Sequence, residues 1–265
     1  SSSMNSFTRP VSLLYLLLSI IGCAEDEPAD KVALQSRLEE HDVETENPDR
    51  PAHDRQAFFG DLHIHSSWSI DAFAMGVGAG PAEAYRYAQG KSIPHTSGTP
   101  IQLAGPPLDF MALTDHAEYL GVIRAGMDEN HPFRAQPLIQ RWLDFDKKLA
   151  LAAWRKIQNT FVRREALPAL VTNQVLEPAW QELITLANTQ NRPGVFTAFV
   201  GFEYSSNPGL QNLHRNVIFR GGDVPARPYS AMDSENPEDL WHWMDEARSK
   251  GDDLLAIPHN SNGSN

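Results

Sequence analysis

The sequence lacks the features on which several classes of protein depend. It holds one cysteine among 265 residues, so no disulfide can form within the chain. Only 22 Lys and Arg stand against 34 Asp and Glu, and the formal net charge of -12 argues against nucleic-acid binding, because phosphate contacts draw on clusters of cations. The chain has no Gly-x-Ser-x-Gly elbow, phosphate loop or dinucleotide-binding glycine pattern. Serine hydrolases and enzymes with nucleotide cofactors are therefore disfavoured.

The apolar stretch near the amino terminus, residues 11–18, is too short to predict a membrane span. Arg9 precedes it, an order that is typical of an export signal. The residues that follow, Ile20-Ile21-Gly22-Cys23, resemble the lipobox of bacterial lipoproteins. We therefore expect residues 1–23 to be a signal peptide with a lipobox, and lipidation of Cys23 to anchor the protein to a bacterial membrane on its periplasmic or cell-surface side. An ordinary signal peptide, cleaved nearby, is the alternative.

The segment over residues 24–56 is acidic, polar and interrupted by proline. Such a composition is typical of a solvated, flexible tether. Apolar residues make up 41% of the whole chain, which is enough for a buried core in the remainder. We expect one folded domain over residues 57–265.

The first strongly patterned segment runs from Gly60 to His65. Side chains in a strand alternate between two faces, which would place Asp61, His63 and His65 on one face and the intervening apolar residues on the other. Imidazole nitrogens and carboxylate oxygens are ligands that zinc, manganese and iron accept. The segment therefore indicates half of a metal site, although a half-exposed strand with incidental polar residues has the same pattern.

Three further apolar runs also end in side chains that can bind a metal. They are residues 109–114 followed by Asp115 and His116, residues 195–202 followed by Glu203, and residues 254–258 followed by His259. In barrels and open α/β sheets, the carboxyl ends of the strands face one cavity. The recurrence therefore favours a shared metal site over chance.

Strand and helix patterns alternate along the chain, which predicts an α/β fold rather than a β-sandwich. Five strands are expected, with starts at Ala57, Asp109, Val195, His214 and Leu254. Helices are expected over residues 80–88, from Asn236 to Gly251, and within a helical insertion around 137–190, where Trp180 and its neighbours recur at helical spacing behind Pro178. The aromatic residues of this insertion fit packing better than a cofactor site.

Together these motifs resemble the PHP (polymerase and histidinol phosphatase) superfamily of metal-dependent phosphoesterases. The resemblance lies in Asp61-Leu62-His63-Ile64-His65-Ser66, Thr114-Asp115-His116, Gly201-Phe202-Glu203 and Pro258-His259-Asn260. A PHP-like branch catalogued as a domain of unknown function is more similar still, through Ser69-Ile70-Asp71-Ala72-Phe73, Asp115-His116-Ala117-Glu118 and Leu213-His214-Arg215-Asn216-Val217. The similarity covers the chain from about Phe58 onward.

The resemblance implies a distorted (β/α)7-type barrel, similar to a TIM barrel, with two or three divalent ions (Mn, Zn or Fe) at its carboxyl-end mouth. It implies that His63 and His65 bind one ion, that Glu203 bridges two, and that the neighbouring shells are completed by His116, His214 and His259. Asp71 takes the place of a further ligand, one residue beyond the usual spacing because of Ile70.

The sequence departs from the superfamily in one further respect. PHP enzymes have an Asp-x-His pair near the carboxyl end of the domain, and none follows His259. Five strands are also fewer than a closed barrel needs. We therefore expect a barrel that is incomplete at its carboxyl terminus, as in a truncated fragment.

The expected function is that of an exported phosphoesterase that hydrolyses phosphate mono- or diesters of a small substrate. A metal-bound hydroxide near Glu203 would attack phosphorus in line. Arg215 would hold a nonbridging oxygen, or else lie on the surface of a strand. Asp115 is a catalytic candidate beside these two, but we assign it, with Asp61, chiefly to orienting the ligating imidazoles.

Two other functions have the same sequence features. Metal sites on barrels also hydrolyse other bonds, such as amides and lactones. A surface lipoprotein that binds metal without catalysis would need the same ligands. The sequence leaves the metal, the substrate and the oligomeric state open.

Overall fold

The structure is a computed structural model, and it describes residues 56–143 and 172–259, with a few positions between them (152, 155, 156, 159, 160, 167 and 170). The expected signal peptide, Cys23 and nearly all of the expected tether lie outside the described residues, as does much of the expected insertion. None of the described helices is long and apolar enough to cross a membrane.

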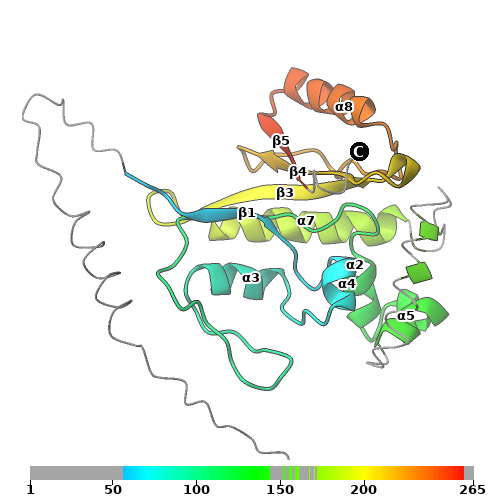
Figure 1. Cartoon of the computed structure of the whole chain (residues 1–265), viewed down its shortest axis with the longest axis horizontal. Coiled ribbons are helices and arrows are strands. Elements are labelled where there is room, and N and C mark those ends of the chain that lie inside the picture. Colours follow the sequence, from blue (N-terminus) through cyan, green and yellow to red (C-terminus); the bar gives the residue numbers. More distant parts are fainter. Residues whose placement is uncertain are drawn as a thin grey trace, which may run out of the picture. The chain divides into compact units, whose positions relative to one another are not determined.

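A curled five-stranded sheet forms the centre of the domain and makes half a barrel (Figure 1). Its strands are adjacent in the order of the sequence, and they are β1 (Gly60–Ile64), β2 (Phe110–Leu113), β3 (Thr197–Ser206), β4 (Leu213–Phe219) and β5 (Leu254–Pro258). The five expected strands are thus confirmed, with bounds that differ by a few residues at most.

The first three strands are parallel, whereas β4 and β5 each run antiparallel to the strand before. A short connection over residues 207–212 reverses the chain between β3 and β4, so no helical crossover can fit there. The described sheet is therefore mixed, and only β1 to β3 have the parallel order of the (β/α) barrel that the resemblance implied.

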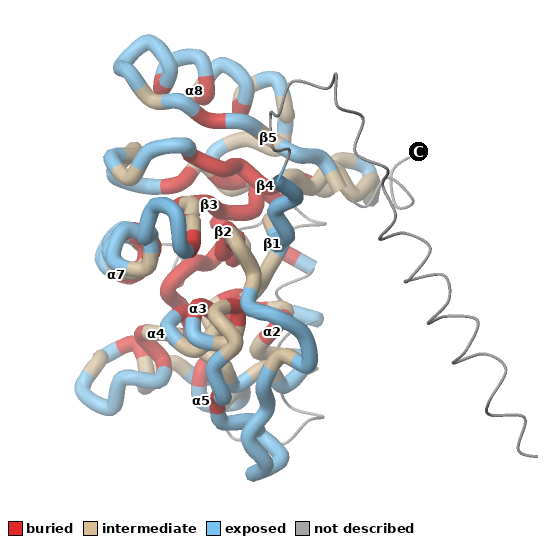
Figure 2. Tube along the Cα trace, turned by 90° about the vertical axis from the view of Figure 1, so that its left-hand side faces the viewer, coloured by how far each residue is buried: buried red, intermediate tan, exposed pale blue. Residues whose placement is uncertain are grey.

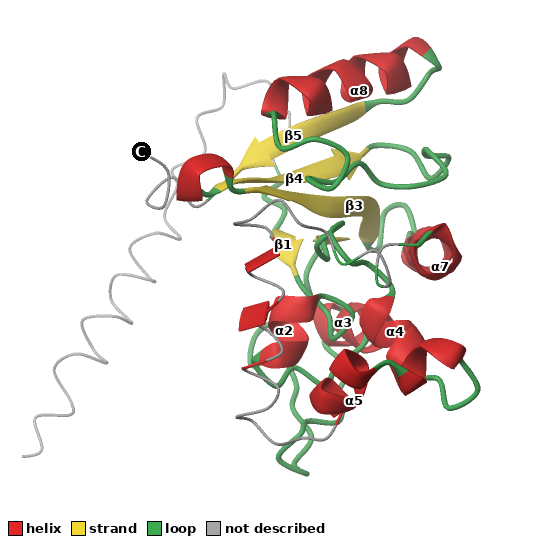
Figure 3. Ribbon diagram, turned by 90° about the vertical axis from the view of Figure 1, so that its right-hand side faces the viewer, coloured by secondary structure: helices red, strands yellow, loops and turns green. Residues whose placement is uncertain are grey.

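Helices precede or connect the strands, as Figure 3 shows. They are α2 (Ile70–Ala74), α3 (Pro81–Ala88), α4 (Val122–Met127), α5 (Pro137–Leu143), α7 (Asn173–Gln190) and α8 (Pro237–Ser249), with short 3-10 turns at Pro132–Ala135 and Pro208–Leu210. The helix expected over residues 80–88 is confirmed; it starts one residue later, at Pro81, where a missing N–H costs nothing. The helix expected from Asn236 is also confirmed, and the Asn236 side chain accepts a hydrogen bond from the Glu238 N–H.

Helix α7 begins earlier than the sequence pattern indicated. Pro178 lies inside it, because the helix starts at Asn173 rather than behind the proline. Proline lacks one N–H, but its fixed φ suits a helix, and the buried side chains of the following turns keep α7 against the sheet.

The sheet has two faces, which we call outer and inner. The outer face carries alternate residues of β3, among them Phe202 and Tyr204, and packs against Trp180 of α7 in one hydrophobic cluster. The rings of Trp180 and Phe202 lie 5.8 Å apart, edge to face, and the Trp180 indole N–H donates to the Pro225 carbonyl at 2.8 Å. Trp180 is thus a packing residue, as expected. Figure 2 shows that buried residues concentrate in β3 and β4.

The inner face carries the other residues of β3, including Glu203 and Ser205, and it is polar toward the carboxyl end of this strand. Toward the edge strand β5 the same face exposes apolar side chains, with Leu255 at 51% and Ile257 at 36%. The candidate site is built on the polar part of the inner face.

Candidate metal centre

Glu203 lies at the centre of the candidate site. Its side chain is 1% exposed, although a carboxylate is costly to bury without compensating partners. The main chain fixes it from both sides, because the Glu203 N–H donates to the Asp115 carbonyl and the Glu203 carbonyl accepts from Ala117. These bonds continue the pairing of β2 and β3 beyond β2, and they bring His116 to the inner face beside Glu203.

The two histidines of the first motif meet one oxygen of this carboxylate. The Nε2 atoms of His65 and His63 lie 2.6 Å and 3.1 Å from Glu203 Oε2. The pairing of β1 with β2 is irregular between Asp61 and Ile64, yet both rings still turn to the inner face. The strand pattern in the sequence therefore predicted correctly that His63 and His65 converge.

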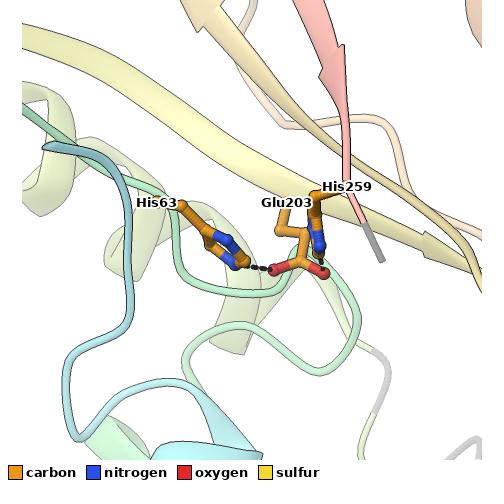
Figure 4. A group of neighbouring side chains, drawn as sticks. All are labelled: His63, Glu203 and His259. Atoms are coloured by element: carbon orange, nitrogen blue, oxygen red, sulfur yellow. Dashed lines mark hydrogen bonds and ion pairs between the residues drawn. The ribbon is translucent and has the colours of Figure 1, made fainter. Parts of the chain in front are cut away.

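The other carboxylate oxygen meets the remaining histidines. Glu203 Oε1 lies 2.6 Å from His214 Nδ1, 3.1 Å from His259 Nε2 and 3.7 Å from His116 Nδ1. His214 belongs to β4, directly opposite Ser205, and His259 follows β5, where its N–H donates to the His214 carbonyl. Figure 4 shows His63 and His259 on either side of the carboxylate.

The imidazole rings also lie against one another. Ring centres are 4.1 Å apart for His63 and His259, and 4.7 Å apart for His65 and His116. Two groups of donor atoms lie within 4.8 Å of each other: His63, Glu203 and His259, and His65, His116 and Glu203. Glu203 belongs to both groups, in keeping with the bridging position that the resemblance implied. The groups separate His63 from His65, whereas the resemblance implied that this pair shares one ion.

Asp71 joins the cluster despite the additional residue before it. Ile70, which is 3% exposed, starts α2, and this turn points the Asp71 carboxylate back toward the histidines. Asp71 Oδ2 lies 3.0 Å from His65 Nδ1 and 3.5 Å from His116 Nε2, and the Ser69 hydroxyl donates to Oδ1 at 2.7 Å. A carboxylate on the second ring nitrogen of a histidine orients the ring toward its ligand.

Asp61 and Asp115 act differently from the prediction. Asp115, 1% exposed, accepts hydrogen bonds from the Ser66 N–H at 2.6 Å and from its hydroxyl at 2.7 Å, so it fixes the loop after β1. Asp61 is exposed and accepts from the main-chain N–H of His63 at 3.0 Å. Both support the main chain beside the histidines, and neither accepts a hydrogen bond from an imidazole in the described residues.

Arg215 is placed away from the cluster, contrary to the prediction that it grips a phosphate oxygen. It is paired with Tyr204 across β3 and β4, whereas Glu203 is paired with Asn216. Because side chains alternate along a strand, Arg215 lies on the outer face with Tyr204. One buried guanidinium nitrogen, Nη1, has no hydrogen-bond partner within the described chain.

Several polar residues beside the histidines were not identified from the sequence. Ser205 hydrogen-bonds with His116 Nδ1, and Asn207 Nδ2 lies 3.3 Å from His214 Nε2. Period-two alternation from Glu203 would have identified Ser205, but nothing in the sequence marks Asn207. Glu118 accepts from the main-chain N–H groups of Ser205 at 3.1 Å and Ala231 at 2.7 Å, so it supports the main chain beside the site.

The electrostatics of the cluster follow from its burial and its close contacts. Burial alone would raise the pKa of Glu203, but the charge of His116 and hydrogen bonds with His214, His259 and His63 hold that pKa well below its usual range. Burial lowers the pKa of His65, yet its hydrogen bonds to Asp71 and Glu203 outweigh this effect and raise the pKa to about 10.

Asp71 is held ionised in the same way. Burial would raise its pKa, and hydrogen bonds from His116 and His65 keep the pKa well below the usual range of a carboxyl group. The site thus combines carboxylates with imidazoles that need protons between them in the absence of a cation.

The donor set fits divalent metal ions. Imidazole nitrogen and carboxylate oxygen suit Zn, Mn and Fe, and an ion would take the place of the protons that these donor atoms otherwise need between them. His259 adds a further observation, because both of its ring nitrogens are buried: Nε2 faces Glu203 Oε1 at 3.1 Å, and Nδ1 has no hydrogen-bond partner within the described residues. An imidazole buried in this way is suited to coordination.

Fold and donor set therefore define a mixed α/β protein with a candidate metal centre on the inner face of its sheet. Residues 52–265 match the model of a family described as protein of unknown function (DUF3604), and the chain belongs to this family. No curated protein and no solved structure matches the chain. The family description names no activity, so the function must be argued from the site.

Proposed function

We propose that the protein is a metal-dependent hydrolase that cleaves phosphate mono- or diesters of a small substrate. The single observation that carries this proposal is the buried Glu203 carboxylate, enclosed by five imidazoles that come from four separate parts of the chain. A packed core does not need this arrangement, because burying so many polar groups together is costly unless a ligand compensates for it. The resemblance to the PHP superfamily supports the same reaction.

In this proposal the residues have distinct roles. His63 and His259 would hold one ion and His65 and His116 the other, with Glu203 between them. Bound ions would neutralise phosphoryl oxygens and lower the pKa of water toward neutrality. Asp71 keeps His65 turned to the site, and Asn207 meets the far nitrogen of His214.

The proposal extends to the fold and the cellular location. We propose that the half-barrel belongs to a distorted barrel of the PHP type, which the parallel strands β1 to β3 with donors at their carboxyl ends support. We also propose export and a lipid anchor at Cys23, on the sequence pattern of residues 1–23 alone.

One observation favours a second candidate, the hydrolysis of an uncharged bond such as an amide or a lactone. Among the hydrogen bonds and ion pairs of the described residues, none joins a Lys or Arg to the cluster, and Arg215 lies on the other face. A phosphate would therefore be neutralised by the ions alone. Metal sites accept both kinds of electrophile, so the substrate assay must include both.

The test is an assay of the full-length protein, loaded with manganese or zinc, on aryl phosphates, phosphodiesters, lactones and amides. We expect turnover of at least one phosphate ester, its abolition by chelation with EDTA, and its loss in Glu203→Gln, which has the same shape without the charge. Glu182→Gln is the matched control, because Glu182 pairs with Arg124 at the surface, on a helix outside the site.

Turnover of lactones or amides alone would refute phosphate ester hydrolysis and support the second candidate function. Metal uptake without turnover of any of these substrates would indicate a metal-binding protein without hydrolytic activity, and it would refute both candidates.

A further inference from the structure

Asn216 is a buried polar residue that is not among the expected metal ligands and has no role in the proposed mechanism. It lies in β4, is 3% exposed, and is paired with Glu203 across β3 and β4. Paired residues share a face of the sheet, so its side chain lies on the inner face beside the cluster.

The Asn216 amide joins two strands that are not neighbours. Its Nδ2 donates to the Leu62 carbonyl of β1 at 3.0 Å, although β2 and β3 separate β1 from β4 in the sheet. The bond thus crosses the inner face of the curled sheet. It ends on the residue directly before His63.

The other end of the same amide is unsatisfied. Asn216 Oδ1 is buried and has no hydrogen-bond partner within the described residues. A leucine would fill a similar volume without burying an unpaired oxygen, so packing alone does not explain an amide at this position. What the amide adds is the bond to β1.

We propose that Asn216 is a positioning residue that holds β1 against β4 and thereby sets His63 opposite Glu203 and His259. The inference rests on the proposed metal centre and concerns the donor group of His63, Glu203 and His259.

The donor group that contains His65 has separate supports. Asp115 fixes Ser66, and the main chains of Ile64 and Thr114 are hydrogen-bonded to each other. Loss of the Asn216 bond therefore weakens the His63 group selectively.

The test compares Asn216→Leu with Asn188→Leu in the full-length protein. Asn188 makes the same kind of bond, from its Nδ2 to the Gly222 carbonyl at 3.1 Å, on the exposed side of α7. The first measurement is hydrogen exchange of the EDTA-treated protein. We expect the amides of residues 60–64 to exchange at least ~10-fold faster in Asn216→Leu, with β2 and β3 unchanged.

The second measurement is a calorimetric titration with cobalt. Wild type and Asn188→Leu are expected to bind two ions, whereas in Asn216→Leu one ion binds as in wild type and the other ~10- to 100-fold more weakly. His63→Ala should weaken the same ion. Asn216→Ser, a shorter side chain, provides the same comparison if the leucine variant does not fold.

The outcomes separate this inference from the proposed function. Two ions bound at wild-type affinity in Asn216→Leu, or an equal weakening of both, would refute the positioning role, and so would failure of both variants to fold. If wild type takes up no cobalt, the metal centre itself is refuted. The exchange of β1 amides then decides alone whether Asn216 holds the strand.

Discussion

Neighbouring residues of β3 lie in two very different environments. On the outer face, Phe202 and Tyr204 are fully buried in one hydrophobic cluster. On the inner face, Glu203 is equally buried but is surrounded by imidazoles. The two faces of the sheet therefore have different roles. The outer face stabilises the fold, whereas the inner face holds charged groups that need protons or cations between them.

The largest expected effect is on stability, from a substitution that disturbs the packing of the outer face alone. Trp180→Ala should lower the free energy of unfolding by about 3–5 kcal/mol, because it removes a fully buried ring from the packing around Phe202. Urea denaturation measures this loss, and the exposed Trp241→Ala is the control, with a change within about 0.5 kcal/mol. Metal binding well below the unfolding transition should persist. Its disappearance would show that the faces are not independent.

The next effect concerns the inner face without metal. The raised pKa of His65, about 10, stabilises the folded state, and this contribution is complete below pH 6.5 and is lost as pH rises toward 10. Stability of the EDTA-treated protein should therefore fall over this range, by at most roughly 1.4 kcal/mol per pH unit for this group. The lowered pKa values of Glu203 and Asp71 act oppositely, so their contribution is lost in acid.

Denaturation of the EDTA-treated protein at pH 6.5, 8 and 10 measures this dependence. Wild type saturated with metal should lose less stability between pH 6.5 and 8, because bound ions replace the proton on His65. Equal slopes with and without metal would contradict the view that the same atoms bind protons and cations.

A smaller effect is expected from Asp71→Asn. The substitution keeps one oxygen near His65 but removes the charge that orients the ring, so affinity for metal should fall ~10- to 100-fold. Asp245→Asn, in an exposed pair with Arg248, is the matched control. Unchanged affinity in calorimetry would exclude Asp71 from the site.

The smallest effect is expected from Arg215→Met. Because Arg215 lies on the outer face, the variant should keep metal affinity and turnover within about threefold of wild type, as expected for independent sites. A loss of turnover of phosphate esters with metal binding intact would contradict this placement, because it would indicate that Arg215 acts on the substrate at the inner face.

Much of this arrangement was predictable from local sequence patterns. Period-two alternation and the apolar runs predicted the five strands, and the donors at the strand ends predicted that His63, His65, His116, Glu203 and His259 meet. These predictions succeed because the pleat fixes which face a residue occupies, and because the donor-bearing ends of the strands converge at one part of the inner face.

Long-range pairing and loop geometry explain what sequence patterns missed. The face of Arg215 depends on its register with β3, which no local pattern reveals. Asp71 reaches His65 through the turn that starts α2, and the bond from Asn216 to Leu62 needs the curl of the sheet. Pro178 lies within α7 because packing against the sheet outweighs a lost hydrogen bond.

The central claim is that the inner face binds metal ions through Glu203, and its most direct test is a metal count by elemental analysis. Wild type, loaded with manganese or zinc and freed of excess metal, should retain two ions per chain, one for each donor group. Glu203→Gln, with the same fold by circular dichroism, should retain fewer than one. Wild type without bound metal, or a Glu203→Gln variant with the same count as wild type, would contradict the account.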